Sequence, residues 1–252
     1  SNKRIYMRPF PSLDRFPVIL NPRPIHNPIG IFQNRDNHKD VYESNVVDLD
    51  SINQFFLDDK ILVIDNVLDE GVLNELHDWC MESTVWHETE KVDYVGAYWT
   101  DGFVHPLLLK IALDMVDKFE FLKGLQLTQA WGYNYHSNRR SGISLHADVA
   151  VVNINLWITP DDANLDSTSG GLIIYRKPLT GNETFQQAQN ASFGYEYIRD
   201  SMDDRVVVPY KRNRIAIFES NLYHETDTLN FKPGYKNRRI NLTFLFGTSI
   251  SA

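Results

Sequence analysis

The feature that most constrains the fold is a change in the spacing of apolar residues at Gly124. Before it, residues 69–82 and 106–119 repeat apolar side chains at helical spacing, with Asp69 as an N-cap and Pro106 in the first turn. After it, apolar and polar residues alternate with the period of a strand. Strands are predicted at 127–135, 143–148, 151–159, 172–175, 206–208, 214–219 and 239–246, with one earlier strand at 61–64. Helices followed by many strands indicate a mainly β protein whose N-terminal helices cover one sheet.

The chain divides into an N-terminal arm and a single domain. Six of the 11 prolines lie within the first 28 residues, where they are incompatible with a helix or a central strand. Residues 1–48 are therefore predicted to form an extended arm, with a partly disordered tail as the alternative. Residues 49–252 are predicted as one domain, with helical support in 49–124 and the β core in 125–248. The polar stretch 176–204 is predicted to be a long insertion between strands.

Composition excludes several classes of function. The net charge is −8, from 33 acidic and 25 basic residues, which argues against nucleic acid as a partner. No apolar run reaches the roughly 20 residues of a membrane span. Cys80 is the only cysteine, so no internal disulfide can form, and an intracellular, reducing compartment such as the cytoplasm or an organelle is expected. The chain does not begin with methionine, so the absence of a targeting peptide says nothing about the native precursor.

A histidine and an aspartate two residues apart carry the clearest chemical signal. On a strand, His146 and Asp148 would project from one face, and His224 follows 76 residues later. Two histidines and one carboxylate on one face of an octahedron leave three open positions, as in non-haem Fe(II) sites. Structural zinc needs four protein ligands, usually including cysteine. A second such pair, His38 and Asp40, lacks apolar flanks and is interpreted as a solvated loop.

An arginine beyond the distal histidine supports the same interpretation. Along the predicted strand 239–246, Arg239, Asn241 and Thr243 share one face, while Arg238 points the other way. A buried arginine is costly without an anion. A carboxylate supplies one, in a bidentate geometry that a guanidinium can match.

These motifs together resemble the Fe(II)/2-oxoglutarate-dependent oxygenases, and most closely the prolyl-hydroxylase-like branch. The matching segments are GISLHAD at 142–148, YHE at 223–225 and RINLT at 239–243. In that branch a tyrosine on the preceding strand binds the cosubstrate, and Tyr135 is the best match. The resemblance covers roughly residues 125–248 and implies a double-stranded β-helix, which is a cupin-like jelly roll of two packed sheets. The 15-residue gap from the distal histidine to the arginine is longer than usual for the family.

The resemblance also implies cofactors and roles. It implies that Fe(II) is held by the catalytic residues His146, Asp148 and His224, and that Arg239 pairs with the distal carboxylate of 2-oxoglutarate. Further cosubstrate contacts are expected from Tyr135, Thr243, Asn155 and Tyr133. With O₂ as the second cosubstrate, the expected outcome is hydroxylation, desaturation or oxidative ring closure at an unactivated C–H bond. Asn153, Asn155, Trp157, Asn241 and Thr243 are expected to line the site; the alternative places them on a solvent-facing side of their strands.

Substrate contacts are predicted less sharply. Tyr98 and Trp99 lie in the aromatic segment 93–103, which is either a lid or a loop packed on the core. The insertion at 176–204 is a second lid candidate. Further predicted substrate contacts are Trp157, Arg139 and Arg140, the two arginines belonging to a basic cluster with His136, Arg176 and Lys177. That cluster either attracts a small carboxylate-bearing metabolite or is a solvated charged loop.

Three alternatives to a small-molecule dioxygenase stay open at this point. One is a protein or peptide side-chain hydroxylase of the same family. Another is a cupin-like metalloenzyme that does not use 2-oxoglutarate, although such an enzyme has no need of an inward-facing Arg239. The third is a non-catalytic jelly-roll binding module that retains the metal-ligand residues. Oligomeric state is not predicted.

Overall fold

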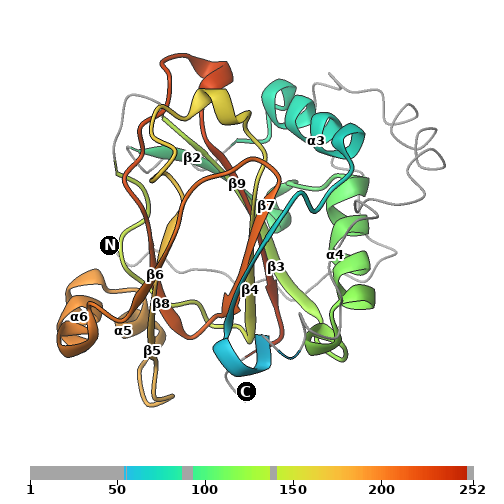
Figure 1. Ribbon diagram of the computed structural model, residues 1–252. Coiled ribbons are helices and arrows are strands. Elements are labelled where there is room, and N and C mark those ends of the chain that lie inside the picture. Colours follow the sequence, from blue (N-terminus) through green and yellow to red (C-terminus); the bar gives the residue numbers. More distant parts are fainter. Residues whose placement is uncertain (1–53, 55, 87–92, 137–140, 249–252) are drawn as a thin grey trace, which may run out of the picture.

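Two antiparallel β-sheets pack face to face in this computed structural model, which describes residues 54, 56–86, 93–136 and 141–248 (Figure 1). The larger sheet has the strand order β1-β7-β4-β9-β3-β2, and the smaller has the order β6-β5-β8. The larger sheet comprises β1 (Ile61–Asp65), β2 (Tyr94–Tyr98), β3 (Leu127–Tyr135), β4 (Val152–Trp157), β7 (Arg214–Glu219) and β9 (Ile240–Phe246). The smaller comprises β5 (Leu172–Pro178), β6 (Arg205–Val208) and β8 (Leu222–Thr226). This is the predicted mainly β jelly roll; the predicted arm at 1–48 lies outside the described residues.

Two helices cover the outer face of the larger sheet. They are α3 (Glu70–Glu82) and α4 (Pro106–Lys118), and both lie on the same side of that sheet in Figure 1. The Asp69 side chain caps α3, as predicted, and the His105 ring caps α4. Their apolar stripes form one core with the outward-facing residues of β4, β7 and β9. Burial of these stripes explains the helical spacing that precedes Gly124.

A second core lies between the two sheets. It contains the alternate residues of the larger sheet, such as Trp131, Tyr133 and Trp157, together with Ile174 and Val208 of the smaller sheet. Asn155, Asn241 and Thr243 share this inner face and are buried. The expectation that these polar residues point inward is therefore confirmed, and the solvent-facing alternative is excluded.

Several predicted elements differ from those observed. Residues 143–148 were predicted as a strand, but they form a loop that meets β8 through a bridge between His146 and His224 and through hydrogen bonds between Ile143 and Thr226. Residues 94–98 were predicted as a lid or a loop, but they form the edge strand β2, paired along its length with β3. The strand β8 was not predicted. Residues 49–124 thus supply two strands of the larger sheet as well as helices.

The polar insertion is ordered around two short helices between β5 and β6. It contains α5 (Phe185–Ala188) and α6 (Ala191–Tyr197), which lie on the outer side of the smaller sheet in Figure 1. A third core cluster, including Leu145, Tyr175 and Tyr223, lies beneath it. Across the described parts of the chain, no helix is both long and apolar enough to cross a bilayer.

Candidate metal centre

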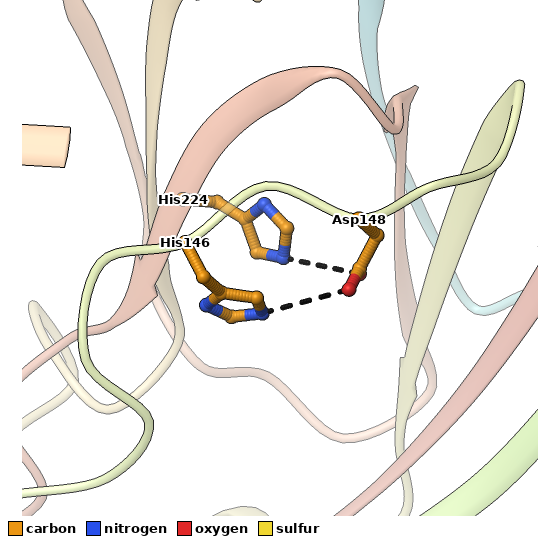
Figure 2. A group of neighbouring side chains, drawn as sticks. All are labelled: His146, Asp148 and His224. Carbon is orange, nitrogen blue, oxygen red and sulfur yellow. Dashed lines mark ion pairs between the residues drawn. The ribbon is translucent and has the colours of Figure 1, made fainter. Parts of the chain in front are cut away.

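Three side chains predicted as metal ligands meet between the sheets. His146 and Asp148 come from the loop before β4, and His224 comes from β8 (Figure 2). The Asp148 carboxylate lies 3.8 Å from His146 Nε2 and 3.5 Å from His224 Nε2. One ligand atom from each residue can be chosen so that all lie within 4.8 Å of one another. The structure therefore brings the predicted set together, although a loop and not a strand presents the first two.

Backbone hydrogen bonds hold the two histidines in register. The His146 N–H donates to the His224 carbonyl at 3.0 Å, and the His224 N–H donates back at 2.8 Å. Each ring contacts a carbonyl two residues earlier through Nδ1, at 2.8 Å for Ser144 and 3.0 Å for Leu222. Because a carbonyl only accepts, each Nδ1 carries the hydrogen and each Nε2 presents a lone pair to the centre. This tautomer suits metal ligation.

Electrostatics favour the same protonation states. Burial, reinforced by the nearby His224, lowers the pKa of His146 to about 4, so its ring is neutral at pH 7. Burial alone would raise the pKa of Asp148, but its interactions with the two histidines and with Asn153 outweigh burial and lower it. A neutral His146 imidazole and an ionised Asp148 carboxylate therefore converge with the His224 ring on one point. A cation is the group that such an arrangement accommodates best.

A buried chain of amide hydrogen bonds runs from Asp148 along the inner face of the larger sheet. Asn153 Nδ2 donates to Asp148 Oδ2 at 2.7 Å, and Asn155 Nδ2 donates to Asn153 Oδ1 at 2.7 Å. Asn155 Oδ1 in turn accepts from Asn241 Nδ2 at 2.8 Å and from Thr243 Oγ1 at 3.1 Å. Asn155 and Thr243, predicted as cosubstrate contacts, thus bond to each other.

Arg239 lies buried at the other end of the inter-sheet space, and its exposed fraction is 1%. Its guanidinium lies 4.7 Å from the Tyr135 ring centre and 5.6 Å from that of Trp157. Nη2 donates to the Gly171 carbonyl at 3.3 Å, whereas Nε and Nη1 have no hydrogen-bond partner among the described residues. Burial lowers the pKa of Arg239. A buried cation with two free donor nitrogens matches the geometry of a carboxylate.

Gly171 allows the close packing beside this arginine. A Cβ added to Gly171 would lie 1.9 Å from the Val208 carbonyl oxygen, so any larger residue would force the two segments apart. The absence of a side chain brings the Gly171 carbonyl within reach of Arg239.

The predicted aromatic contacts separate into different environments. Tyr135 lies beneath Arg239, and its hydroxyl is 3.4 Å from Thr226 Oγ1. The Tyr133 hydroxyl is instead 2.8 Å from the Tyr98 hydroxyl, on the same inner face. Trp157 is fully buried beside Arg239. Trp99 packs against the helix-side core, a position that does not fit the substrate contact expected for it.

The predicted basic cluster is not seen as a unit. Arg139 and Arg140 lie outside the described residues. Arg176 pairs with Asp59 at 2.6 Å, and Lys177 donates to the Tyr197 carbonyl at 2.6 Å. These last two cations therefore fasten surface segments together.

The α5–α6 insertion holds the segments that carry the candidate ligands. Ala147, between His146 and Asp148, donates its N–H to the Ala188 carbonyl at 3.0 Å and accepts from Gln189 Nε2 at 2.8 Å. On the neighbouring strand β8, the Glu225 carboxylate accepts from the hydroxyls of Tyr175 at 2.7 Å and Tyr195 at 2.5 Å. The insertion, predicted as a lid, thus packs behind the ligand-bearing segments. No sequence signal singled out Gln189, because its partner is a backbone atom 42 residues away.

Comparison with solved structures supports the fold. The epimerase SnoN of nogalamycin biosynthesis, solved with Fe³⁺, α-ketoglutarate and nogalamycin RO, matches with a TM-score of 0.57 at 14% identity, covering 80% of this chain and 84% of that one. HygX from Streptomyces hygroscopicus, solved with nickel, 2-oxoglutarate and hygromycin B, matches with a TM-score of 0.53 at 11% identity over 79% and 86% of the two chains. A prolyl 4-hydroxylase from Phytophthora capsici matches with a TM-score of 0.50 at 15% identity over 84% and 69%.

The chain therefore has the fold of the 2-oxoglutarate-dependent non-haem iron oxygenases, which confirms the fold expected from the sequence resemblance. No protein-family model and no curated protein matches the sequence. At 11–15% identity the structural likeness is one of fold, so the chemistry has to be argued from the side chains.

Proposed function

We propose that the protein is an Fe(II)- and 2-oxoglutarate-dependent dioxygenase that oxidises an unactivated C–H bond of a small molecule. The observation that carries the proposal is the pairing of two groups in one inter-sheet space. One is the convergence of His146, Asp148 and His224, and the other is the buried Arg239 with two free donor nitrogens. A metalloenzyme that did not use an anionic cosubstrate would leave Arg239 unexplained.

The three converging residues fit Fe(II). Their lone pairs face a common point without a hydrogen between them, and both histidines are fixed in the ligating tautomer. When bound, Fe(II) supplies the activation of O₂, coupled to decarboxylation of 2-oxoglutarate, that oxidises the substrate. The role of the protein is to hold the ligands, orient the cosubstrate and exclude water from the space between the sheets.

The Arg239 end fits the distal carboxylate of 2-oxoglutarate. Nε and Nη1 can donate to it, and the Tyr135 hydroxyl beside Thr226 offers a further hydrogen bond. Burial between Tyr135 and Trp157 removes competing water, which strengthens the charge pair. Thr243 and Asn155 serve the site through the amide chain, and their direct contact with the cosubstrate remains a prediction.

The substrate is proposed to meet the aromatic residues Tyr98, Trp131 and Tyr133 on the inner faces of β2 and β3. Tyr98 lies 6.0 Å from Trp131 between ring centres, and within the described segments the Trp131 indole N–H has no hydrogen-bond partner. SnoN and HygX were solved with small organic molecules, which favours a substrate of that kind. These three residues replace Trp99 in the proposal.

Anaerobic titration tests the proposal directly. Fe(II) and 2-oxoglutarate added together should produce the weak visible charge-transfer band of a 2-oxo acid chelated to Fe(II). Fe(II) with succinate, which has no 2-oxo group, is the control and should give no such band. Absence of the band with 2-oxoglutarate, in protein shown to bind Fe(II), would contradict the proposed cosubstrate.

A further inference from the structure

We infer that Asn153 is a positioning residue for the metal ligand Asp148, and that the buried chain of Asn155, Asn241 and Thr243 fixes its orientation. The inference rests on the metal site of the proposed function and adds residues that do not themselves bind the metal. It begins from the 2.7 Å hydrogen bond between Asn153 Nδ2 and Asp148 Oδ2.

The direction of the chain is set by the carboxylate. An ionised carboxylate only accepts hydrogen bonds, so Asn153 has to present its amide N–H to Asp148. Its Oδ1 then faces Asn155, which donates to it, and Asn155 Oδ1 is left to accept from Asn241 and Thr243. Every amide in the chain therefore points its donor end toward Asp148. A flip at one position would place two donors or two acceptors together.

This alignment acts on the metal ligand in two ways. The amide dipoles polarise one another and favour the ionised carboxylate, which is the form that binds a metal. The donor from Asn153 also restricts rotation of the Asp148 carboxyl group, so the ligand is positioned before the metal arrives. Because the chain is buried, water does not replace these bonds when one is lost: Asn153 and Asn155 are 1% and 4% exposed.

The chain also explains a residue pattern that packing does not. Inner-face positions elsewhere in the two sheets are filled by Trp131, Phe218 and other apolar residues. Three asparagines and a threonine in adjacent positions of β4 and β9 cost desolvation, which only mutual hydrogen bonding offsets. Because this polar row ends on the metal ligand Asp148, it can position that carboxylate, which a polar row with no such end could not do.

Titration of the metal-free protein with Co(II) tests the inference without turnover. Substitution of hydrogen-bonding partners behind metal ligands typically weakens metal binding about 10- to 100-fold. Asn153→Leu keeps the branched shape of the side chain but removes the donor to Asp148, and its loss of Co(II) affinity should fall in that range. Asn155→Leu removes the donor that orients Asn153 and should weaken Co(II) binding less, by about 10-fold, at the lower end of the same range.

Asn134→Leu is the matched control. Asn134 is a fully buried asparagine on β3 whose side chain alternates to the other face of the same sheet and has no hydrogen-bond partner among the residues described by the structure. The Asn134→Leu variant should bind Co(II) with the affinity of the wild type. The visible absorption of bound Co(II), which depends on ligand arrangement, should change in Asn153→Leu and stay unchanged in the control.

The outcomes separate this inference from the proposed function. If the wild-type protein binds no Co(II) or Fe(II), the proposed function itself fails. If the wild type binds metal and folded Asn153→Leu binds it equally well with an unchanged spectrum, the inference is overturned while the function stands. If Asn153→Leu does not fold, Asn155→Leu decides the question: weaker binding with an altered spectrum supports the inference, and wild-type binding overturns it.

Discussion

The two ends of the inter-sheet space are built on opposite principles. At the metal end, Asp148, Asn153 and Asn155 bond to one another in an ordered chain without any ligand. At the other end, Arg239 is equally buried, yet two of its nitrogens have no hydrogen-bond partner in the part of the chain that the structure describes. The first end is held together by the protein itself, whereas the second has hydrogen-bond donors to spare. Under the proposed function, the first end fixes a metal ligand and the second recognises the anionic end of the cosubstrate.

The largest expected effect is loss of the metal. His146→Ala or His224→Ala leaves two ligands, which hold a divalent ion poorly, so both metal binding and turnover should be abolished. Equilibrium dialysis against Fe(II) under anaerobic conditions measures binding. His38→Ala, in the second histidine–aspartate pair of the sequence, should leave both unchanged. If His38→Ala removes the metal while His146→Ala retains it, the metal centre has been assigned to the wrong pair.

The next largest effect is on the apparent KM for 2-oxoglutarate, and it should differ between the neighbouring residues Arg238 and Arg239. Truncating one partner of a buried charge pair costs about 2–5 kcal/mol, so Arg239→Ala should raise the apparent KM for 2-oxoglutarate by about 30-fold or more. Arg238 lies over the Tyr235 ring, away from the inter-sheet space. Arg238→Ala should therefore change the apparent KM for 2-oxoglutarate by only a few-fold. Succinate formation against 2-oxoglutarate concentration measures both. Iron affinity should survive both changes, and a reversed order of effects would mean that Arg238 recognises the carboxylate.

Opposite changes in stability would sharpen the comparison further. Arg239→Met removes an unpaired buried charge and should raise the free energy of unfolding of the ligand-free protein by about 1 kcal/mol or more. Asn155→Leu leaves Asn153 Oδ1 without its donor and removes the acceptor that Asn241 and Thr243 share, so it should lower the free energy of unfolding by about 1–3 kcal/mol. Urea unfolding measures the change in the free energy of unfolding for each variant and shows whether the two changes have opposite signs. If both variants are destabilised alike, the Arg239 end is not strained in the absence of a ligand.

The smallest effect is a dependence of stability on pH. The pKa of His146 is lowered to about 4 in the folded protein, from about 6.5 when unfolded, so the unfolded state binds more protons between these values. The metal-free protein should therefore lose stability as pH falls through 6.5 toward 4. Between pH 7 and pH 6 the loss attributable to this group is under about 1 kcal/mol. His146→Gln should flatten the profile in this range; an equally steep profile in the variant would assign the dependence to other groups.

Residue alternation predicted the inner faces of the long strands well. The alternation in β3, β4 and β9 separated Arg239 from Arg238 and placed Asn155 and Thr243 inward, because a strand with one face on each core has little freedom in register. Alternation failed at residues 143–148, where an apparent strand is a loop that bonds to β8 only at Ile143 and His146 among the described residues. It also failed at β2, whose only strand partner in the sheet is β3.

The supports behind the metal ligands could not be predicted from the sequence. Asn153 was expected to line the site, but its bond to Asp148 depends on the path of the loop that joins them. Gln189 binds the backbone of Ala147, which carries no side-chain signal of its own. Contacts of this kind depend on how distant segments pack, and local residue patterns do not encode them.

The hydrogen bonds between Ala147 and the α5–α6 insertion make the Ala147 amide a probe of local opening at the metal site. Its amide hydrogen is donated to the Ala188 carbonyl, so exchange with deuterium requires that the insertion separate from the loop between His146 and Asp148. The exchange rate of this one hydrogen therefore reports how often the backbone between two ligands is released. A metal that binds both ligands should slow that release, although no atom of Ala147 touches it.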